Sequence, residues 1–310
     1  MRKCLFLRKC PRSVNGKKSQ YLQHQPIFTK VPPNRSHPYY FRQQIRLYVY
    51  RLLLLPALLI LLWLFCIRPY KNRRATAEAF CKNAFAHRGL HGTVPENTLP
   101  AFAKARENSV GIELDVRLTK DKEVVVFHDE TLLRAAGLDR KISDLTYAEL
   151  KTIPLFGSEE TVPLLSEAVR EADGVPLLVE IKAYIDCAEL CEKTCLILQG
   201  YKGPLAIESF SPIALRWFAK NRPEYLRGQL SSRFKDREAK AIPLWQRLLI
   251  TNLLTNFLAK PDFLAYDIRN KHQISLQLCK KIYHVPVLYW TVQCGEKEGC
   301  IFENQIQRSL

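Results

Sequence analysis

The first 77 of the 310 residues contain no aspartate and no glutamate, and the first acidic residue is Glu78. The same stretch holds sixteen of the 47 lysines and arginines, so it accounts for nearly all of the formal charge of +17. A nucleic-acid-binding domain carries its basic charge on the folded surface that meets phosphate. Because the remainder of this chain is nearly neutral, we expect no nucleic-acid partner.

The ten cysteines include no Cys-x-x-Cys pair and no Cys/His spacing typical of a zinc site. The chain is also long enough to fold without disulfide bonds. Cys187, Cys191 and Cys195 recur every four residues, which places them on one face of a helix. Buried thiols behave as small hydrophobic groups, so the pattern favours core packing over metal or redox chemistry.

No charged residue interrupts the apolar run from Leu52 to Ile67. As a helix it would span about 24 Å, slightly less than the roughly 30 Å hydrocarbon core of a bilayer. Extension to Leu47 supplies the missing length, and Arg51 is close enough to one end to reach the headgroups. A cleaved signal peptide and a buried core helix are the alternatives. The 46 preceding residues and the basic stretch that follows favour an uncleaved transmembrane helix over residues 47–67.

Basic residues flank this predicted span unequally, with twelve up to Arg51 and four directly after it. The positive-inside rule therefore predicts a single-pass membrane protein with a cytoplasmic N-terminus and an extracytoplasmic large domain, although the four residues behind the span act against this orientation. Residues 1–46 form a basic segment, and its Pro, Ser, Asn and Gln content predicts disorder over 11–45. Residues 80–310 are then the globular domain.

Within this domain, apolar strand-like runs alternate with helix-like stretches over about 230 residues. This alternation predicts an α/β fold of the TIM (β/α)8-barrel type, in which functional groups lie where strands end. The candidate strands end at Arg88, Asp115, Asp129, Lys182, Phe210, Leu230, Asp267 and Thr291, and helix-like spacing covers 98–109, 146–153, 164–173, 187–198 and 211–224. Thr98 is a candidate helix cap. His128 lies only thirteen positions after Asp115, so we expect a helix-less link over 118–123.

Two apolar strands are interrupted by charge. Glu113 and Asp115 lie two positions apart in "GIELDVRL" and therefore project from the same face, and Glu180 and Lys182 have the same spacing in "PLLVEIKAY". Neighbouring carboxylates in a partly buried site repel and are poorly solvated, so they need a cation to stay ionised. The pattern indicates a metal site.

An ordered set of short motifs resembles the glycerophosphodiester phosphodiesterase family, and most of all its membrane-attached members from Gram-positive bacteria. The matching pieces are "HRG" at 87–89, "PENT" at 95–98, "E-x-D" at Glu113 and Asp115, "FHD" at 127–129, "E-x-K" at Glu180 and Lys182, "SF" at 209–210 and "WT" at 290–291. The resemblance implies a TIM barrel that hydrolyses glycerophosphodiesters to glycerol 3-phosphate and an alcohol. A lysophospholipase D or related phospholipase is the enzymatic alternative, and a catalytically impaired membrane-attached binding protein is the alternative of another class.

The same resemblance implies a role for each site residue. Glu113, Asp115 and Glu180 would hold a divalent cation, Mg²⁺ or Ca²⁺, because all their ligand atoms are oxygen. His87 and His128 would be the acid/base pair, and Arg88 and Lys182 would bind the phosphate. Glu96 and Asn97 would bind metal or glycerol or simply shape their loop. Asp129 could hold His128 or pair with Arg134, Ser209 and Trp290 could line the pocket or the core, and His91 is taken as structural.

The sequence departs from the family after Thr291. Family members continue through a helix to a closing strand that bears Thr-Asp, whereas only nineteen residues follow here and none of them forms Thr-Asp. The run Cys300–Glu303, "CIFE", is the one candidate for a short last strand. The sequence therefore does not decide whether the barrel closes.

Overall fold

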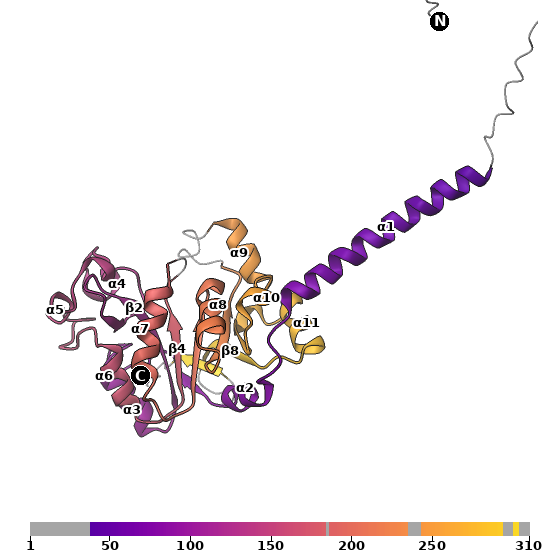
Figure 1. The fold of residues 1–310 in the computed structure, drawn as a ribbon. Helices are drawn as coiled ribbons and strands as arrows, with labels where there is room; N and C mark the ends of the chain where they lie inside the picture. The colour runs from indigo at the N-terminus through magenta and orange to yellow at the C-terminus, as the bar shows by residue number, and fades with distance from the viewer. Residues whose placement is uncertain (1–37, 184–185, 235–242, 294–299, 304–310) are drawn as a thin grey trace, which may run out of the picture. The chain divides into compact units, whose positions relative to one another are not determined.

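The computed structural model describes residues 38–183, 186–234, 243–293 and 300–303 (Figure 1). The chain divides into two compact units, Met1–Leu55 and Pro56–Leu310. The helices are α1 (Pro38–Ile67), α2 (Arg74–Cys81), α3 (Leu99–Glu107), α4 (Leu133–Ala136), α5 (Tyr147–Leu150), α6 (Leu165–Ala172), α7 (Ala188–Leu198), α8 (Pro212–Asn221), α9 (Leu244–Thr251), α10 (Asn256–Ala259) and α11 (Ile274–Ile282), with 3-10 turns η1 (Ile142–Asp144) and η3 (Ile268–Asn270). The strands are β1 (Phe85–Ala86), β2 (Gly111–Leu118), β3 (Val124–Val126), β4 (Leu177–Ile181), β5 (Leu205–Ser209), β6 (Leu226–Ser231), β7 (Phe263–Asp267), β8 (Val287–Gln293) and β9 (Cys300–Glu303).

All strands except β3 form a closed parallel barrel. Their order is β1-β9-β8-β7-β6-β5-β4-β2, and the pairing of β1 with β2 closes the ring. The register aligns Asp115 on β2 with Glu180 on β4, and Glu180 with Glu208 on β5. The TIM-barrel prediction is confirmed, and the polar strand ends meet at one edge, as the parallel arrangement requires.

The strand β3 has a different role from the one that the sequence indicated. The run ending at Asp129 was expected to be a barrel strand, and that prediction is wrong, because β3 pairs antiparallel with β2 outside the ring. The expected helix-less link is confirmed, since the chain turns back over residues 119–123. A hairpin needs only a few residues, whereas a parallel return needs a crossover of a dozen or more.

The strand β9 completes the barrel. It pairs in parallel with β8 on one side and with β1 on the other, with Ile301 opposite Phe85. Four residues are enough here because β1 itself is only two residues long. The candidate last strand Cys300–Glu303 is therefore real, and the segment 294–299 before it lies outside the described residues.

The five predicted helices are present as α3, α5, α6, α7 and α8, whereas α2, α4, α9, α10 and α11 were not predicted. Thr98 is the N-cap residue of α3, as predicted, but its side chain makes no capping hydrogen bond, because its hydroxyl donates to the carbonyl of Pro95 at 2.7 Å. The expected packing of the thiols is confirmed, since Cys187, Cys191 and Cys195 are buried and not disulfide-bonded.

Apolar packing fills the amino-terminal end of the barrel. Ala77, Phe80 and Cys81 of α2 join a buried cluster with Phe85 and Phe263. Gly228 on β6 leaves room for the Phe263 ring, which a Cβ atom at that position would strike. This apolar packing closes the end of the barrel opposite the polar strand ends.

The helix α1 begins at Pro38, ahead of the predicted start at Leu47. Its segment Phe41–Ile67 has a mean hydropathy of 2.3 over its most apolar window and is long and apolar enough to cross a membrane. The final residue, Ile67, is fully buried against Leu253, Leu264 and their neighbours. The end of this helix is thus part of the same compact unit as the barrel.

Candidate active site and metal centre

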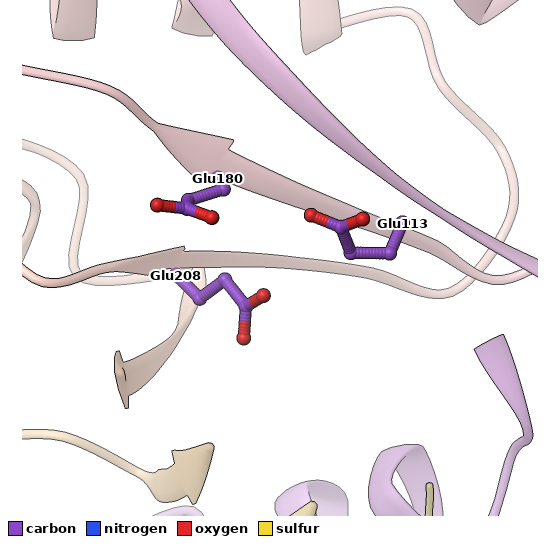
Figure 2. A group of neighbouring side chains, drawn as sticks. All are labelled: Glu113, Glu180 and Glu208. Carbon is purple, nitrogen blue, oxygen red and sulfur yellow. The ribbon is translucent and has the colours of Figure 1, made fainter. Parts of the chain in front are cut away.

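Three buried carboxylates converge from neighbouring strands. Glu113, Glu180 and Glu208 come from β2, β4 and β5, and each offers an oxygen within 4.8 Å of the other two (Figure 2). None of the three residues is more than 6% exposed. Three carboxylates at this separation form a possible all-oxygen site for a hard divalent cation.

The electrostatics of the cluster favour a bound cation. Burial, followed by the charge of Asp115, raises the pKa of Glu113 well above its usual value. Burial, followed by Glu113, raises the pKa of Glu208 in the same way, and burial raises the pKa of Glu180 to about 7. One oxygen of Glu208 is buried with no hydrogen-bond partner among the described residues. A divalent cation would satisfy that oxygen and remove the repulsion, so the residues present fit a metal.

Asp115 was predicted to be a metal ligand, but it does not belong to this group of three. Its carboxylate accepts a hydrogen bond from Asn97 Nδ2 at 2.8 Å and lies 3.0 Å from Lys182 Nζ. Although burial opposes it, the charge of Lys182 holds the pKa of Asp115 well below its usual value. The sequence reasoning missed Glu208, although a carboxylate inside the apolar run "PLAIESF" is the same signal that revealed Glu113.

Each catalytic histidine candidate is held by a carboxylate. His87 Nδ1 lies 2.7 Å from Glu303 Oε2, and His128 Nδ1 lies 2.5 Å from Asp129 Oδ1. An ionised carboxylate only accepts hydrogen bonds, so Nδ1 must carry the proton in both residues. The second ring nitrogen, Nε2, then has the lone pair that a general base needs. In His87 this atom lies 4.0 Å from Glu113 Oε2, which places it at the carboxylate cluster.

Both imidazoles are disposed to be neutral at pH 7. Burial is the largest effect on each and lowers the pKa of His87 below its usual value. Burial, followed by the charge of Lys182, lowers the pKa of His128 to about 4. Neutral imidazoles can accept a proton from a hydroxyl group, and the negative charge of a bound phosphodiester would favour the protonated form that a general acid requires.

Glu303 is a second residue of the candidate site that sequence reasoning missed. It ends β9 and also lies 3.2 Å from His91 Nε2, so it links His87 to the loop that contains His91. Although burial opposes it, hydrogen bonds from His87 and His91 together hold the pKa of Glu303 below its usual value. No local pattern connects residues 87 and 303, and only barrel closure brings them together.

The two predicted phosphate-binding cations are already paired with carboxylates. Arg88 donates its backbone N–H to Glu113 at 2.9 Å and its Nη1 to Glu96 at 2.7 Å. Lys182 Nζ lies 2.8 Å from Glu180 and 3.0 Å from Asp115. Both cations therefore border the cluster, where they offset the carboxylate charge that would otherwise repel a phosphodiester.

A second network surrounds His128. Both alternatives for Asp129 are present, because it holds His128 and also accepts from Arg134 Nε at 2.6 Å. Arg134 in turn donates to Glu96 at 2.6 Å. Glu96 is thus joined to the loop of His128 through Arg134, which shows how it can shape the site without contacting a ligand.

Trp290 and Ser209 have different surroundings. The Trp290 ring packs edge-on against Phe210 at 5.8 Å between centroids, and its indole Nε1 is buried with no hydrogen-bond partner among the described residues. Ser209 donates to the carbonyl of Ile181 at 2.8 Å and is buried. The geometry therefore gives Ser209 a structural role, whereas Trp290 retains an unused donor.

A closed parallel barrel with a buried carboxylate cluster and two carboxylate-bound histidines defines a class of protein, a TIM barrel suited to metal-assisted acid–base chemistry. Residues 87–295 match the glycerophosphoryl diester phosphodiesterase family, and this chain belongs to that family.

Curated relatives and solved structures agree with this assignment. The chain is 47% identical over 108 residues to a glycerophosphodiester phosphodiesterase of Bacillus altitudinis, a match that covers 32% of this chain and 44% of that protein. It is 36% identical over 118 residues to the lysophospholipase D GDPD1 of Homo sapiens, which covers 34% of this chain and 38% of that protein. The matched segments thus span less than half the length of these relatives.

A solved phosphodiesterase of Oleispira antarctica, in complex with the product sn-glycerol-3-phosphate, is 25% identical, with a TM-score of 0.58 over 74% of this chain and 95% of that one. The glycerophosphodiester phosphodiesterase of Thermotoga maritima is 27% identical, with a TM-score of 0.54 over 72% and 95%. Both likenesses support the barrel described above.

Proposed function

We propose that this protein hydrolyses glycerophosphodiesters to glycerol 3-phosphate and an alcohol. The observation that carries the proposal is the pair of carboxylate-bound histidines, His87 and His128, beside a buried cluster of glutamates. Family membership supports it, as does the product seen in the Oleispira antarctica relative.

Glu113, Glu180 and Glu208 would hold the divalent cation, Mg²⁺ or Ca²⁺, with Asp115 as the alternative ligand implied by the family resemblance. When bound, the cation supplies a positive charge that polarises the phosphoryl group. Arg88 and Lys182 keep the surrounding carboxylates neutralised, and Asn97 fixes one oxygen of Asp115. Glu96 positions Arg88 and Arg134.

The histidines would move the protons. One accepts the proton of the glycerol 2-hydroxyl group as its oxygen bonds to phosphorus, and the other donates a proton to the alcohol oxygen as its bond to phosphorus breaks. The product of this step is a cyclic phosphate. Water then opens the ring with the two roles exchanged, which restores both histidines. Trp290 would form one wall of the pocket.

Lysophospholipase D activity is the second candidate. The apolar helix α1, which would keep the barrel beside lipid, favours it, and so does the name of the human relative. An impaired binding protein is less well supported, because β9 completes the ring and contributes Glu303 to the site.

An assay of product release tests these functions directly. The purified chain, supplied with Mg²⁺ or Ca²⁺, should release glycerol 3-phosphate and alcohol from glycerophosphocholine or a related water-soluble diester. Release of lysophosphatidate and choline from lysophosphatidylcholine would support the lysophospholipase D alternative. If no diester is cleaved with either metal, the catalytic proposal is wrong and the binding-protein alternative gains support.

We further propose that residues 47–67 cross a membrane once, with residues 1–46 cytoplasmic and the domain 80–310 extracytoplasmic. The apolar composition of α1 supports the span, and the flanking basic residues support the direction. The full-length protein should stay in the membrane pellet after an alkaline carbonate wash. Protease added to intact cells should digest the barrel. Extraction by carbonate alone would rule out the spanning helix, and protection of the barrel would reverse the orientation.

A further inference from the structure

The helix α9 exposes its apolar face. Leu244, Trp245 and Leu248 are 65%, 61% and 54% exposed, and their spacing places them on one side of the helix. The other side is anchored, since Ile250 is buried. A surface helix of a water-soluble domain normally has the reverse pattern, so a large outward apolar face indicates a binding surface.

The segment that follows α9 packs against the end of α1. Leu253, which follows α9, is buried against Ile67, and the Phe257 ring of α10 lies 5.8 Å from that of Phe65. Phe257 is itself 44% exposed. Asn256 Nδ2 donates to the carbonyl of Ile67 at 2.9 Å, which ties α10 to the last turn of α1 (Figure 1). If α1 crosses a bilayer up to Ile67, Phe65 and Phe257 lie together at its surface.

The helix α9 is also fixed to the catalytic edge of the barrel. Ser231, the last residue of β6, donates to the carbonyl of Ile250 at 2.8 Å. Tyr266 near the end of β7 donates to the carbonyl of Thr251 at 2.8 Å. The carboxyl ends of β6 and β7 are on the same edge of the barrel as the glutamate cluster. Whatever contacts the exposed face of α9 therefore also lies beside the site.

The residues that follow the apolar segments are basic. Arg68 comes directly after α1 and Lys71 three residues later, and Lys260 comes directly after α10. Lysine and arginine next to a membrane-inserted segment are attracted to anionic headgroups. An exposed apolar helix face that includes a tryptophan is typical of a helix that lies in the bilayer interface.

We propose that the outward face of α9, with Phe257, is a lipid-contact surface that inserts into the interface of the bilayer crossed by α1. It orients the mouth of the barrel toward the membrane, so that diesters carried on lysolipids reach the glutamate cluster without leaving the interface. This inference rests on the membrane anchor and deepens the proposed function by assigning lipid-borne diesters as a substrate class.

Fluorescence quenching by brominated lipid tests the contact independently of activity. Full-length protein in nanodiscs made with brominated phosphatidylcholine and phosphatidylglycerol should show quenching of Trp245. Trp63 and the other tryptophans also contribute to the signal. The measured quantity is therefore the difference in quenching between the wild type and Trp245→Phe. Trp217→Phe on α8 is the matched control, since Trp217 packs against the outer core of the barrel. Equal quenching in wild type and Trp245→Phe would overturn the proposal.

A kinetic comparison tests the consequence. In the same nanodiscs, the double variant Leu244→Gln/Leu248→Gln should lower the ratio of lysolipid turnover to soluble-diester turnover by about tenfold, because polar side chains weaken insertion. Leu196→Gln on α7 replaces a leucine that is 57% exposed elsewhere and should leave the ratio unchanged.

The two experiments separate the possible failures. Cross-linking between copies through Leu248→Cys in nanodiscs, without quenching of Trp245, would assign the face to a second copy and refute lipid contact. If Trp245 is quenched but no diester is turned over, the lipid-contact proposal stands and the proposed hydrolase function is refuted.

Discussion

Chelation of divalent cations is expected to abolish turnover, and Glu113→Gln is expected to raise the metal concentration needed for half-maximal activity by about two orders of magnitude or more. The reason is the burial of Glu113, Glu180 and Glu208 within 4.8 Å of one another. Replacement of one carboxylate by an amide removes a charge that the cation would otherwise neutralise. Titration calorimetry with Mg²⁺ and Ca²⁺ measures the loss of affinity without reference to activity.

The same measurement distinguishes Glu208 from Asp115 as a metal ligand. We expect Glu208→Gln to weaken metal binding, because its carboxylate belongs to the cluster and has a buried oxygen with no hydrogen-bond partner among the described residues. Asp115→Asn should affect affinity less, because Asn97 and Lys182 already engage that carboxylate. Glu189→Gln, on the surface of α7, is a control that should bind metal normally.

Thermal unfolding provides a second readout of binding. Metal at about 100 times its dissociation constant should stabilise the wild type by about 2.7 kcal/mol, and less in any variant that has lost a ligand. If Glu208→Gln binds metal with wild-type affinity and Asp115→Asn loses most of its metal affinity, the ligands are Glu113, Asp115 and Glu180. Full turnover in excess chelator would refute the metal site altogether.

His128→Ala and His87→Ala should each lower turnover by about two to four orders of magnitude, the usual contribution of a positioned proton-transfer group. The leaving group then separates the two roles. A p-nitrophenyl diester departs without protonation, so the variant that lacks the general acid should recover most of its rate on that substrate. The variant that lacks the general base should stay slow on both substrates.

His272→Ala is the control, because His272 is an exposed histidine outside the site. Glu303→Gln tests how His87 is oriented, and we expect a loss of about ten- to a hundredfold, the value of one hydrogen bond to a charged group. Near-normal rates in His128→Ala on an alcohol-leaving diester would reassign His128 to a structural role.

Local sequence was sufficient to predict the barrel class, and it picked out most of the residues that the structure brings together at the candidate site. The two-residue spacing of Glu113 and Asp115 puts them on one face of any strand, whatever its neighbours. A charge inside an apolar run likewise identified Glu180 as a residue of the candidate site. Helical spacing predicted that the three cysteines are buried on one face of a helix. These features depend on backbone periodicity, which residues a few positions apart determine.

Tertiary structure alone decided which strands are neighbours. The hairpin of β3, the closing position of β9 and the approach of Glu303 to His87 depend on pairings between residues far apart in the chain. Glu208 joins Glu113 and Glu180 because β5 lies beside β4, and α9 turns its apolar face outward because its other side is bound to β6 and β7. Strand order is selected by packing and hydrogen bonding over the whole barrel, so a local pattern predicts which residues are polar or buried but not which of them meet.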